Sequence, residues 1–256
     1  MGKTKIDWCD RVWNPTIGCT KVSQGCKFCY AERIYERFHP GQKFSDIHCI
    51  PGRLEMPLHW RQPQRVFVDS MSDLFHEDVP FEFILLVWAK IAVSQQHTFM
   101  ILTKRPTRMR EIVEKLVRQG YGLPGNVWLG VSVEDQATAD ERIPLLLQTP
   151  AAKRFVNYEP ALGPLDLDSE SANELHVLGC GDDHCTCGDR GIDWLIMGCE
   201  SGPGARPMDI EWARSARDQC QAAGVPFFLK QMMVDGKLIH MPFLDRRTWK
   251  QFPEVK

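Results

Sequence analysis

The chain has no run of eighteen apolar residues, and its start, MGKTKIDWCD, lacks the apolar stretch of a secretion signal. These absences predict a cytoplasmic protein without membrane spans. No Gly-x-Gly-x-x-Gly follows an early strand-like segment, and no phosphate loop of the form Gly-x4-Gly-Lys-Ser/Thr occurs, which disfavours a nucleotide-binding open sheet. There is also no low-complexity tract, and the only repetition is an alternation of short apolar and amphipathic segments.

The composition is that of a folded globular protein, with 43% hydrophobic and 25% charged residues. The formal net charge of −2 argues against broad, nonspecific binding to nucleic acids. The unusual feature is the count of ten cysteines. In a reducing cytoplasm, clustered cysteines indicate metal binding or redox chemistry rather than disulfides.

From residue 60 onward, apolar strand-like segments alternate with amphipathic helical ones at the spacing of βαβ units. The predicted strands are Arg65–Ser70, Thr98–Thr103, Asn126–Val133, Arg154–Tyr158, Asp193–Cys199 and Val225–Lys230, with a possible seventh within Arg11–Gly18. The predicted helices are Tyr30–Phe38, Phe81–Gln96, Thr107–Gln119, Asp135–Gln148 and Ile210–Ala223.

This rhythm predicts an α/β fold, a single domain over residues 1–256 formed by a complete or partial (β/α) barrel of six to seven parallel strands. Five successive strand ends are polar, with the sequences DSMSD, LTKRP, SVED, NYEP and GCESG. Active sites of such barrels lie at the carboxyl ends of the strands. Residues 166–191 interrupt the alternation of strand-like and helical segments, and we predict an irregular, cysteine-containing insertion there.

The most specific motif is the C-x6-C-x2-C run formed by Cys19, Cys26 and Cys29. Three thiolates on one loop entering a helix are suited to a soft metal centre. A structural zinc site needs a fourth ligand, which Cys9 or Cys49 could supply. A four-iron four-sulfur cluster held by only three cysteines instead leaves one iron open to a substrate or cofactor.

The segment Cys26-Lys-Phe-Cys29, with an aromatic residue before the last cysteine, resembles the commonest motif of the radical S-adenosylmethionine superfamily. The spacing of six residues before Cys26 departs from the usual three. More closely, the chain resembles a phage-associated family of three-cysteine proteins in the segments WNPTIGCTKVSQGCKFCYAE, VFVDSMSDLFHEDVP, ILTKRP, VWLGVSVED, YEPALGPLDL, GCESGPGARPM and GVPFFLKQ.

The resemblance implies an N-terminal cluster loop ahead of the barrel, with S-adenosylmethionine as cofactor and a reductant such as flavodoxin or ferredoxin as partner. It also implies that polar strand ends hold the cofactor's ammonium, carboxylate and ribose groups. The residues that we assign to cofactor binding are Phe28, Ser70, Ser72, Asp73, Lys104, Ser132, Glu134, Glu159 and Glu200.

Ordinary structural roles are open for several of these residues. The Ser70–Asp73 segment suits an Asx turn or helix cap before Phe75. Glu134 suits a cap for the helix that begins near Asp135. Lys104 suits a solvated loop. The second cysteine group, formed by Cys180, Cys185 and Cys187, is either a zinc or auxiliary cluster site or a surface loop.

Two functions therefore compete. In the first, the protein is a radical S-adenosylmethionine enzyme. A nucleic acid or modified nucleotide is its leading substrate, and a peptide or small metabolite is the alternative. In the second, zinc or an iron–sulfur cluster has only a structural role in a nucleic-acid binding or processing protein. The basic stretch from Met100 to Gly120 suggests the nucleic-acid binding. The sequence does not predict the oligomeric state.

Overall fold

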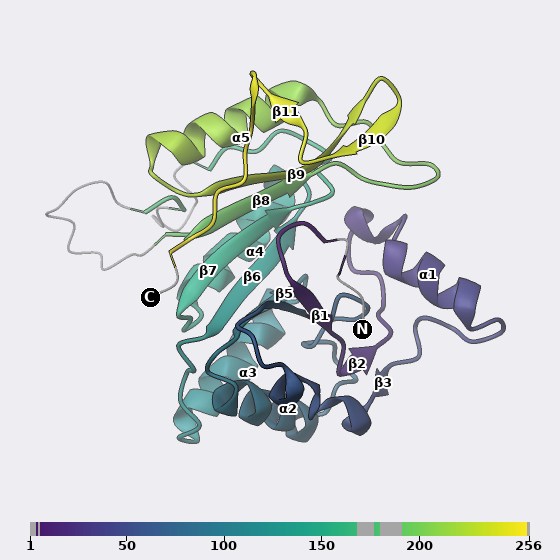
Figure 1. Cartoon of the computed structure of the whole chain (residues 1–256), viewed down its shortest axis with the longest axis vertical. Coiled ribbons are helices and arrows are strands. Elements are labelled where there is room, and N and C mark those ends of the chain that lie inside the picture. The colour runs from purple at the N-terminus through teal and green to yellow at the C-terminus, as the bar shows by residue number, and fades with distance from the viewer. Residues whose placement is uncertain (1–3, 5, 168–176, 180–190, 255–256) are drawn as a thin grey trace, which may run out of the picture. The chain divides into compact units, whose positions relative to one another are not determined.

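The computed structural model describes residues 4, 6–167, 177–179 and 191–254 of the chain (Figure 1). It divides into two compact units, residues 1–130 with 149–152 and residues 131–148 with 153–256. The strand β6 (Val127–Val133) belongs to both, because the division falls between Gly130 and Val131. The single domain over residues 1–256 stays a prediction.

The first unit is built on three parallel strands, β1 (Arg11–Trp13), β4 (Arg65–Val68) and β5 (Thr98–Thr103). β1 pairs with β4, and β4 pairs with β5. Its other elements are α1 (Tyr30–Phe38), α2 (Phe81–Val93), α3 (Pro106–Arg118), the antiparallel pair β2 (Thr16–Ile17) and β3 (His48–Cys49), and the 3-10 helices η1 (Gln24–Cys26), η2 (Pro51–Arg53) and η3 (Met56–His59).

Burial explains why these segments form strands. Val66 and Val68 alternate with Phe67 along β4, and all three are buried, as expected for a parallel strand covered on both faces. α3 begins at Pro106, whose missing N–H is not needed in the first helical turn. α3 contacts α2 through Lys115, whose ammonium lies 3.6 Å from the centre of the Phe81 ring.

The second unit contains the parallel strands β7 (Lys153–Tyr158), β8 (Trp194–Gly198) and β9 (Phe227–Val234), which pair in that order. The strand β10 (Lys237–His240) pairs antiparallel with β9. The remaining elements are α4 (Gln136–Gln148), α5 (Ile210–Ala222) and the hairpin of β11 (Phe243–Leu244) and β12 (Arg247–Thr248).

The hydrogen-bonded strand order is β1-β4-β5-β6-β7-β8-β9-β10. The predicted mixed α/β fold with a mostly parallel sheet is confirmed. Each predicted strand and helix is present, most of them with ends shifted by a few residues. The order ends at β1 and at β10, so the described strands do not close into the complete barrel that was one form of the prediction. The sequence analysis missed β10, because Asp235 and Gly236 form a turn with positive φ (50° and 73°) that reverses the chain.

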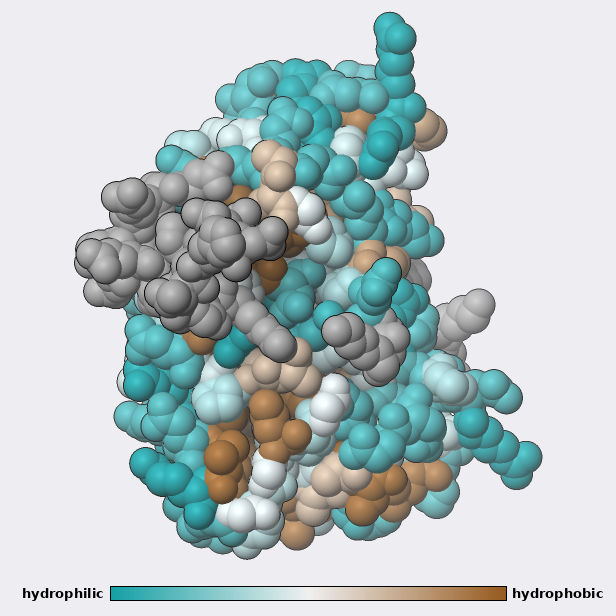
Figure 2. Space-filling model, turned by 90° about the vertical axis from the view of Figure 1, so that its left-hand side faces the viewer, coloured by the Kyte–Doolittle hydropathy of each residue, from teal (hydrophilic) through white to brown (hydrophobic). Residues whose placement is uncertain are grey.

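Within the described residues, no helix is both long and apolar enough to cross a membrane. The face drawn in Figure 2 is mostly hydrophilic, with hydrophobic side chains reaching the surface in patches. Exposed large hydrophobic residues on helices of the first unit include Ile34, Phe38, Leu86 and Val93.

Candidate functional site

The cysteine loop, residues 18–29, starts where β2 ends and is tied to the segment that follows β4. The Gly18 N–H donates to the Met71 carbonyl (3.1 Å), and Ser72 Oγ donates to the Gly18 carbonyl (2.7 Å). Gly18 has φ +102°, and a Cβ there would clash with the carbonyl oxygens of Asp46 and Phe44. A glycine is therefore required at the entrance to the loop.

The three predicted metal ligands share one neighbourhood in the first unit. Cys19 and Cys29 both pack against the cluster of Ala31, Tyr35 and Phe44. Burial raises the pKa of the Cys19 thiol to about 12, and it also raises the pKa of Cys29. The charge of Cys26 contributes a smaller part of each shift.

The donor set suits a soft metal centre, although no group of three His, Cys, Asp or Glu side chains is already arranged for a metal ion among the described residues. The three thiols are partly exposed and free of disulfides. Three sulfur donors on one loop fit an iron–sulfur cluster.

The two cysteines considered as a fourth zinc ligand, Cys9 and Cys49, have other neighbours. The Cys9 thiol lies at the amino end of β1, where Asp10, Arg65 and Phe67 act on its pKa. Cys49 lies on β3, opposite Thr16, and the charge acting on its pKa is that of Asp69. The cysteines 180, 185 and 187, proposed as a second metal group, lie outside the described residues.

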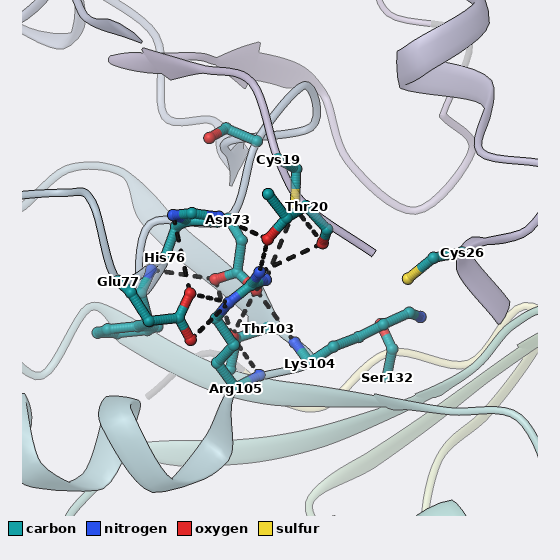
Figure 3. Close-up of polar contacts among 12 residues, drawn as sticks. Cys19, Thr20, Cys26, Asp73, His76, Glu77, Thr103, Lys104, Arg105 and Ser132 are labelled. Carbon is teal, nitrogen blue, oxygen red and sulfur yellow. Dashed lines mark hydrogen bonds and ion pairs between the residues drawn. The ribbon is translucent and has the colours of Figure 1, made fainter. Parts of the chain in front are cut away.

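Arg105 connects the cysteine loop to the ends of β4 and β5 (Figure 3). Its Nη1 donates to Cys19 Sγ (3.6 Å) and to Asp73 Oδ2 (3.2 Å). Its Nη2 donates to the carbonyl (3.2 Å) and Oγ1 (2.8 Å) of Thr20. Its Nε donates to Glu77 Oε2 (2.9 Å), so every N–H donor of the guanidinium group has a partner.

Asp73 is the acceptor at the centre of this network, with a side chain that is only 7% exposed. Its Oδ1 accepts from the Phe75 N–H (3.0 Å) and from Thr103 Oγ1 (2.8 Å). Its Oδ2 accepts from Arg105 and from the Lys104 N–H (3.3 Å). The Asx turn considered for Asp73 is therefore present, and the carboxylate already has internal donors. Binding of a cofactor ammonium by Asp73 stays a prediction.

His76 also holds the cysteine loop, through a hydrogen bond to Thr20. Its Nδ1 accepts from the Asp78 N–H (3.1 Å), so Nε2 carries the proton and donates to Thr20 Oγ1 (2.8 Å). Burial lowers the pKa of His76, and the nearby Arg105 lowers it further, which keeps the ring neutral. Thr20 is thus held by both His76 and Arg105.

The other cofactor-binding residues predicted in the first unit have different surroundings. Ser70 Oγ donates to Asn14 Oδ1 (3.1 Å), which ties β4 to the segment after β1. Phe28 is partly buried, with the Lys27 ammonium 5.3 Å from the centre of its ring. The Lys104 side chain points away from Arg105 (Figure 3).

In the second unit, Glu134 is fully buried and paired with Arg142, whose Nη1 lies 3.1 Å from Glu134 Oε2. The same nitrogen donates to the Ser132 carbonyl (2.8 Å). The helix cap suggested for Glu134 is instead made by its neighbour, because Asp135 Oδ1 accepts from the Thr138 N–H (3.0 Å).

Glu200 and Glu159 also pair with cations of the second unit. Arg206 donates to Glu200 from its backbone N–H (2.9 Å) and from Nε (2.9 Å). The side-chain hydrogen bond with Glu200 raises the pKa of Arg206. Glu134 acts on Arg206 as well. Glu159 Oε1 accepts from Lys230 Nζ (2.6 Å) and Gln231 Nε2 (3.0 Å).

The predicted cofactor residues thus fall into two groups, one in each unit. Sequence reasoning missed several of their partners: Thr20, His76, Glu77, Thr103, Arg142, Lys230 and Gln231. It named Lys104 rather than Arg105 as the inward cation, and in the structure Arg105 is the residue directly before α3, with its guanidinium on Cys19 and Asp73.

A family model described as "Protein of unknown function (DUF5131)" matches residues 3–253, and the chain belongs to this family. No curated protein and no solved structure matches the chain.

Proposed function

We propose that this member of the DUF5131 family is a radical S-adenosylmethionine enzyme, with Cys19, Cys26 and Cys29 as the ligands of a four-iron four-sulfur cluster. The observation that carries the proposal is the contact of Arg105 Nη1 with Cys19 Sγ at 3.6 Å, beside the carboxyl ends of β4 and β5. It adds to the C-x6-C-x2-C motif and to the packing of Cys19 and Cys29 against the same buried cluster.

Cluster and cofactor, when bound, supply one-electron cleavage of a carbon–sulfur bond in S-adenosylmethionine. The residues of the chain bind and shield these groups. Thiolate ligands carry negative charge, and the Arg105 cation beside Cys19 offsets part of it. Hydrogen bonds to cluster sulfurs tune reduction potential. Phe28, which precedes Cys29 in the sequence and is partly buried, would shield the cluster from water.

The remaining strand ends provide polar groups for the cofactor. The Lys104 ammonium would bind the carboxylate of the methionine moiety, and the Ser132 hydroxyl would bind the ribose. Glu134 and Glu200 are held by arginines, so they act best as fixed acceptors rather than as proton donors. We propose a nucleic acid or modified nucleotide as substrate, and flavodoxin or ferredoxin as the electron donor.

The test is anaerobic reconstitution of the full chain with iron and sulfide. The proposal expects about four irons per chain and a cluster absorption band. It also expects cleavage of S-adenosylmethionine to 5′-deoxyadenosine under dithionite. Cys26→Ser should lose most of the iron and the cleavage, whereas the matched control Cys49→Ser should keep both.

The alternative hypothesis, in which the cysteines bind a structural zinc ion, predicts the opposite results. A colourless protein that contains zinc after anaerobic purification would overturn the proposal, as would cleavage that survives Cys26→Ser.

A further inference from the structure

The C-terminal hairpin of the second unit presents an aromatic side chain to solvent. Phe243, on β11, is 71% exposed, the largest value among the exposed large hydrophobic residues of the described chain. It pairs across the hairpin with Thr248 of β12, which is also exposed. Residues that are paired in this way lie on the same face of a hairpin. Phe243 and Thr248 therefore share a face that is open to an incoming ligand.

The opposite face of this hairpin is anchored to the second unit. Leu244 pairs with Arg247 across the hairpin and is only 1% exposed. The guanidinium carbon of Arg247 lies 3.5 Å from the centre of the Trp249 ring, and Trp249 Nε1 donates to the Leu244 carbonyl (3.2 Å). The Phe243 side chain is thus presented by a hairpin that is already ordered, which lowers the entropic cost of binding a ligand.

The segments on either side of the hairpin lie along one edge of β9, since β8 occupies its other edge. Before the hairpin, His240 of β10 lies opposite Gln231 of β9. After the hairpin, Lys250 forms an antiparallel bridge with Phe228 of β9. Lys250 and Lys237, both exposed, therefore flank the hairpin on the same edge of the sheet.

Positive charge predominates over this segment. Residues 237–250 contain four Lys or Arg residues, and Asp245 is the only acidic residue among them. Asp245 is already neutralised by two arginines of α5, at 3.0 and 2.7 Å (α5 and β11 in Figure 1). Arg246 and Lys250 are exposed, and no ion pair involves them among the described residues. Their charges remain available to an anionic ligand.

The turn of the hairpin holds Arg246 in an uncommon backbone conformation. Asp245 and Arg246 have φ of 51° and 70°, as the two central residues of a tight hairpin turn require. Glycine or asparagine adopts this conformation more easily than arginine does. The ion pairs with α5 explain the aspartate. A role of the Arg246 charge in binding explains the arginine.

The basic stretch from Met100 to Gly120, which the sequence analysis associated with nucleic acids, uses much of its charge within the first unit. Arg105 is buried against Asp73. Arg110 pairs with Glu114 on α3, and the Lys115 ammonium lies over the Phe81 ring of α2. The C-terminal hairpin of the second unit is therefore the better candidate for a surface that binds a polyanion.

We propose that the hairpin surface, formed by Phe243, Arg246, Thr248 and Lys250, binds single-stranded nucleic acid. Phe243 stacks on an unpaired base, and the two cations contact phosphates. A single strand is favoured over a duplex because only unpaired bases expose their faces to an aromatic ring. As a place where a substrate strand docks, the surface rests on the proposed function, but the binding itself needs neither cluster nor cofactor.

Fluorescence anisotropy on the full chain without cluster tests the stacking, with labelled oligothymidine and oligouridine of about 20 nucleotides as probes. Phe243→Ala should weaken binding at least about fivefold, because one base–aromatic stack is lost, whereas Phe243→Trp should retain it. Phe38→Ala is the matched control, since Phe38 on α1 is 69% exposed and should not affect binding. Unchanged binding in Phe243→Ala, or an equal loss in Phe38→Ala, would overturn the proposal.

The salt dependence of binding tests the charges. Arg246→Asn and Lys250→Gln should each make the slope of log K against log salt less steep by about 0.7, the value for one phosphate contact on a single strand. The Tm of Arg246→Asn should not fall, because asparagine tolerates the positive φ. Arg118→Gln, at the end of α3, should leave the slope unchanged. If Arg118→Gln lowers the slope and Arg246→Asn does not, the strand binds elsewhere and the proposal is wrong.

The same assay distinguishes the possible partners. Tighter binding of oligouridine indicates an RNA strand and tighter binding of oligothymidine a DNA strand, and either result supports the proposal. Polyglutamate that competes as well as the oligonucleotides, with no effect of Phe243→Ala, would indicate an acidic protein instead and would overturn it. Failure of iron reconstitution would overturn the proposed enzyme activity and leave these binding results unaffected, so the two proposals fail separately.

Discussion

At the scale of single residues, the first unit contains a buried ion pair between Arg105 and Asp73. The two side chains are 5% and 7% exposed, and their closest charged atoms are 3.2 Å apart. Removing one partner of a buried pair leaves the other charged and desolvated. We therefore expect Arg105→Ala to lower the free energy of unfolding by about 3–5 kcal/mol in urea titrations.

The exposed pair of Arg110 and Glu114 provides the control. These side chains are 37% and 34% exposed and lie one helical turn apart on α3. Arg110→Ala should change the free energy of unfolding by less than about 0.5 kcal/mol. Similar losses for both arginine variants would show that burial of the Arg105 network does not contribute to stability.

Asp69 is predicted to make stability depend on pH. It is the residue after β4, has φ +56°, and donates its N–H to the Trp13 carbonyl (2.8 Å). Burial raises its pKa from 3.8 to about 8. Because the folded state holds this proton more tightly than the unfolded state, the resulting stabilisation is complete below pH 4 and is lost as pH rises through 8.

Asp69→Asn isolates this effect, since asparagine tolerates the positive φ and keeps an acceptor for the Thr16 N–H. Denaturation of both proteins between pH 4 and 9 should show that the variant gains stability relative to the natural chain as pH rises. A difference that stays constant with pH would contradict the raised pKa of Asp69.

At the scale of elements, the entrance of the cysteine loop depends on Gly18. A side chain there requires both an unfavourable φ and displacement of the Phe44 carbonyl, which would lie 2.9 Å from the new Cβ. Gly41 has a positive φ of +82° but open space around it. Gly41→Ala should cost about 1 kcal/mol from φ alone, and Gly18→Ala about 1–3 kcal/mol more.

Chemical denaturation measures both losses, and iron binding after reconstitution measures the effect on the loop. Gly18→Ala should reduce the iron content, whereas Gly41→Ala should leave it unchanged. Equal losses of stability would mean that the carbonyls around Gly18 move aside at little cost.

At the scale of the molecule, β6 belongs to both compact units, and all seven of its residues are buried. Neither unit can unfold without affecting this strand. We expect the described chain to unfold in one urea transition, coincident for tryptophan fluorescence and far-UV circular dichroism. Two separated transitions would instead indicate that β6 divides into independent halves.

The sequence by itself determined the parallel strands, the helices between them and the cysteine motif. Buried parallel strands such as β4 and β8 are continuous apolar runs, and this pattern is local. Within the part of the chain that the structure describes, the strands that this pattern did not predict are the two-residue strands and those of the C-terminal hairpins. Short strands carry too little periodicity, and the turn at Asp235-Gly236 was not used as a signal.

Only the tertiary structure decided which polar side chains pair. Arg105 meets Cys19 across 86 residues, and Lys230 meets Glu159 across 71. Sequence reasoning places a charged residue at a strand end, but the partner comes from a distant segment through strand order and side-chain direction. The exposure of Phe243 is decided for the same reason: an aromatic residue is known to face solvent only when the surrounding residues have been placed.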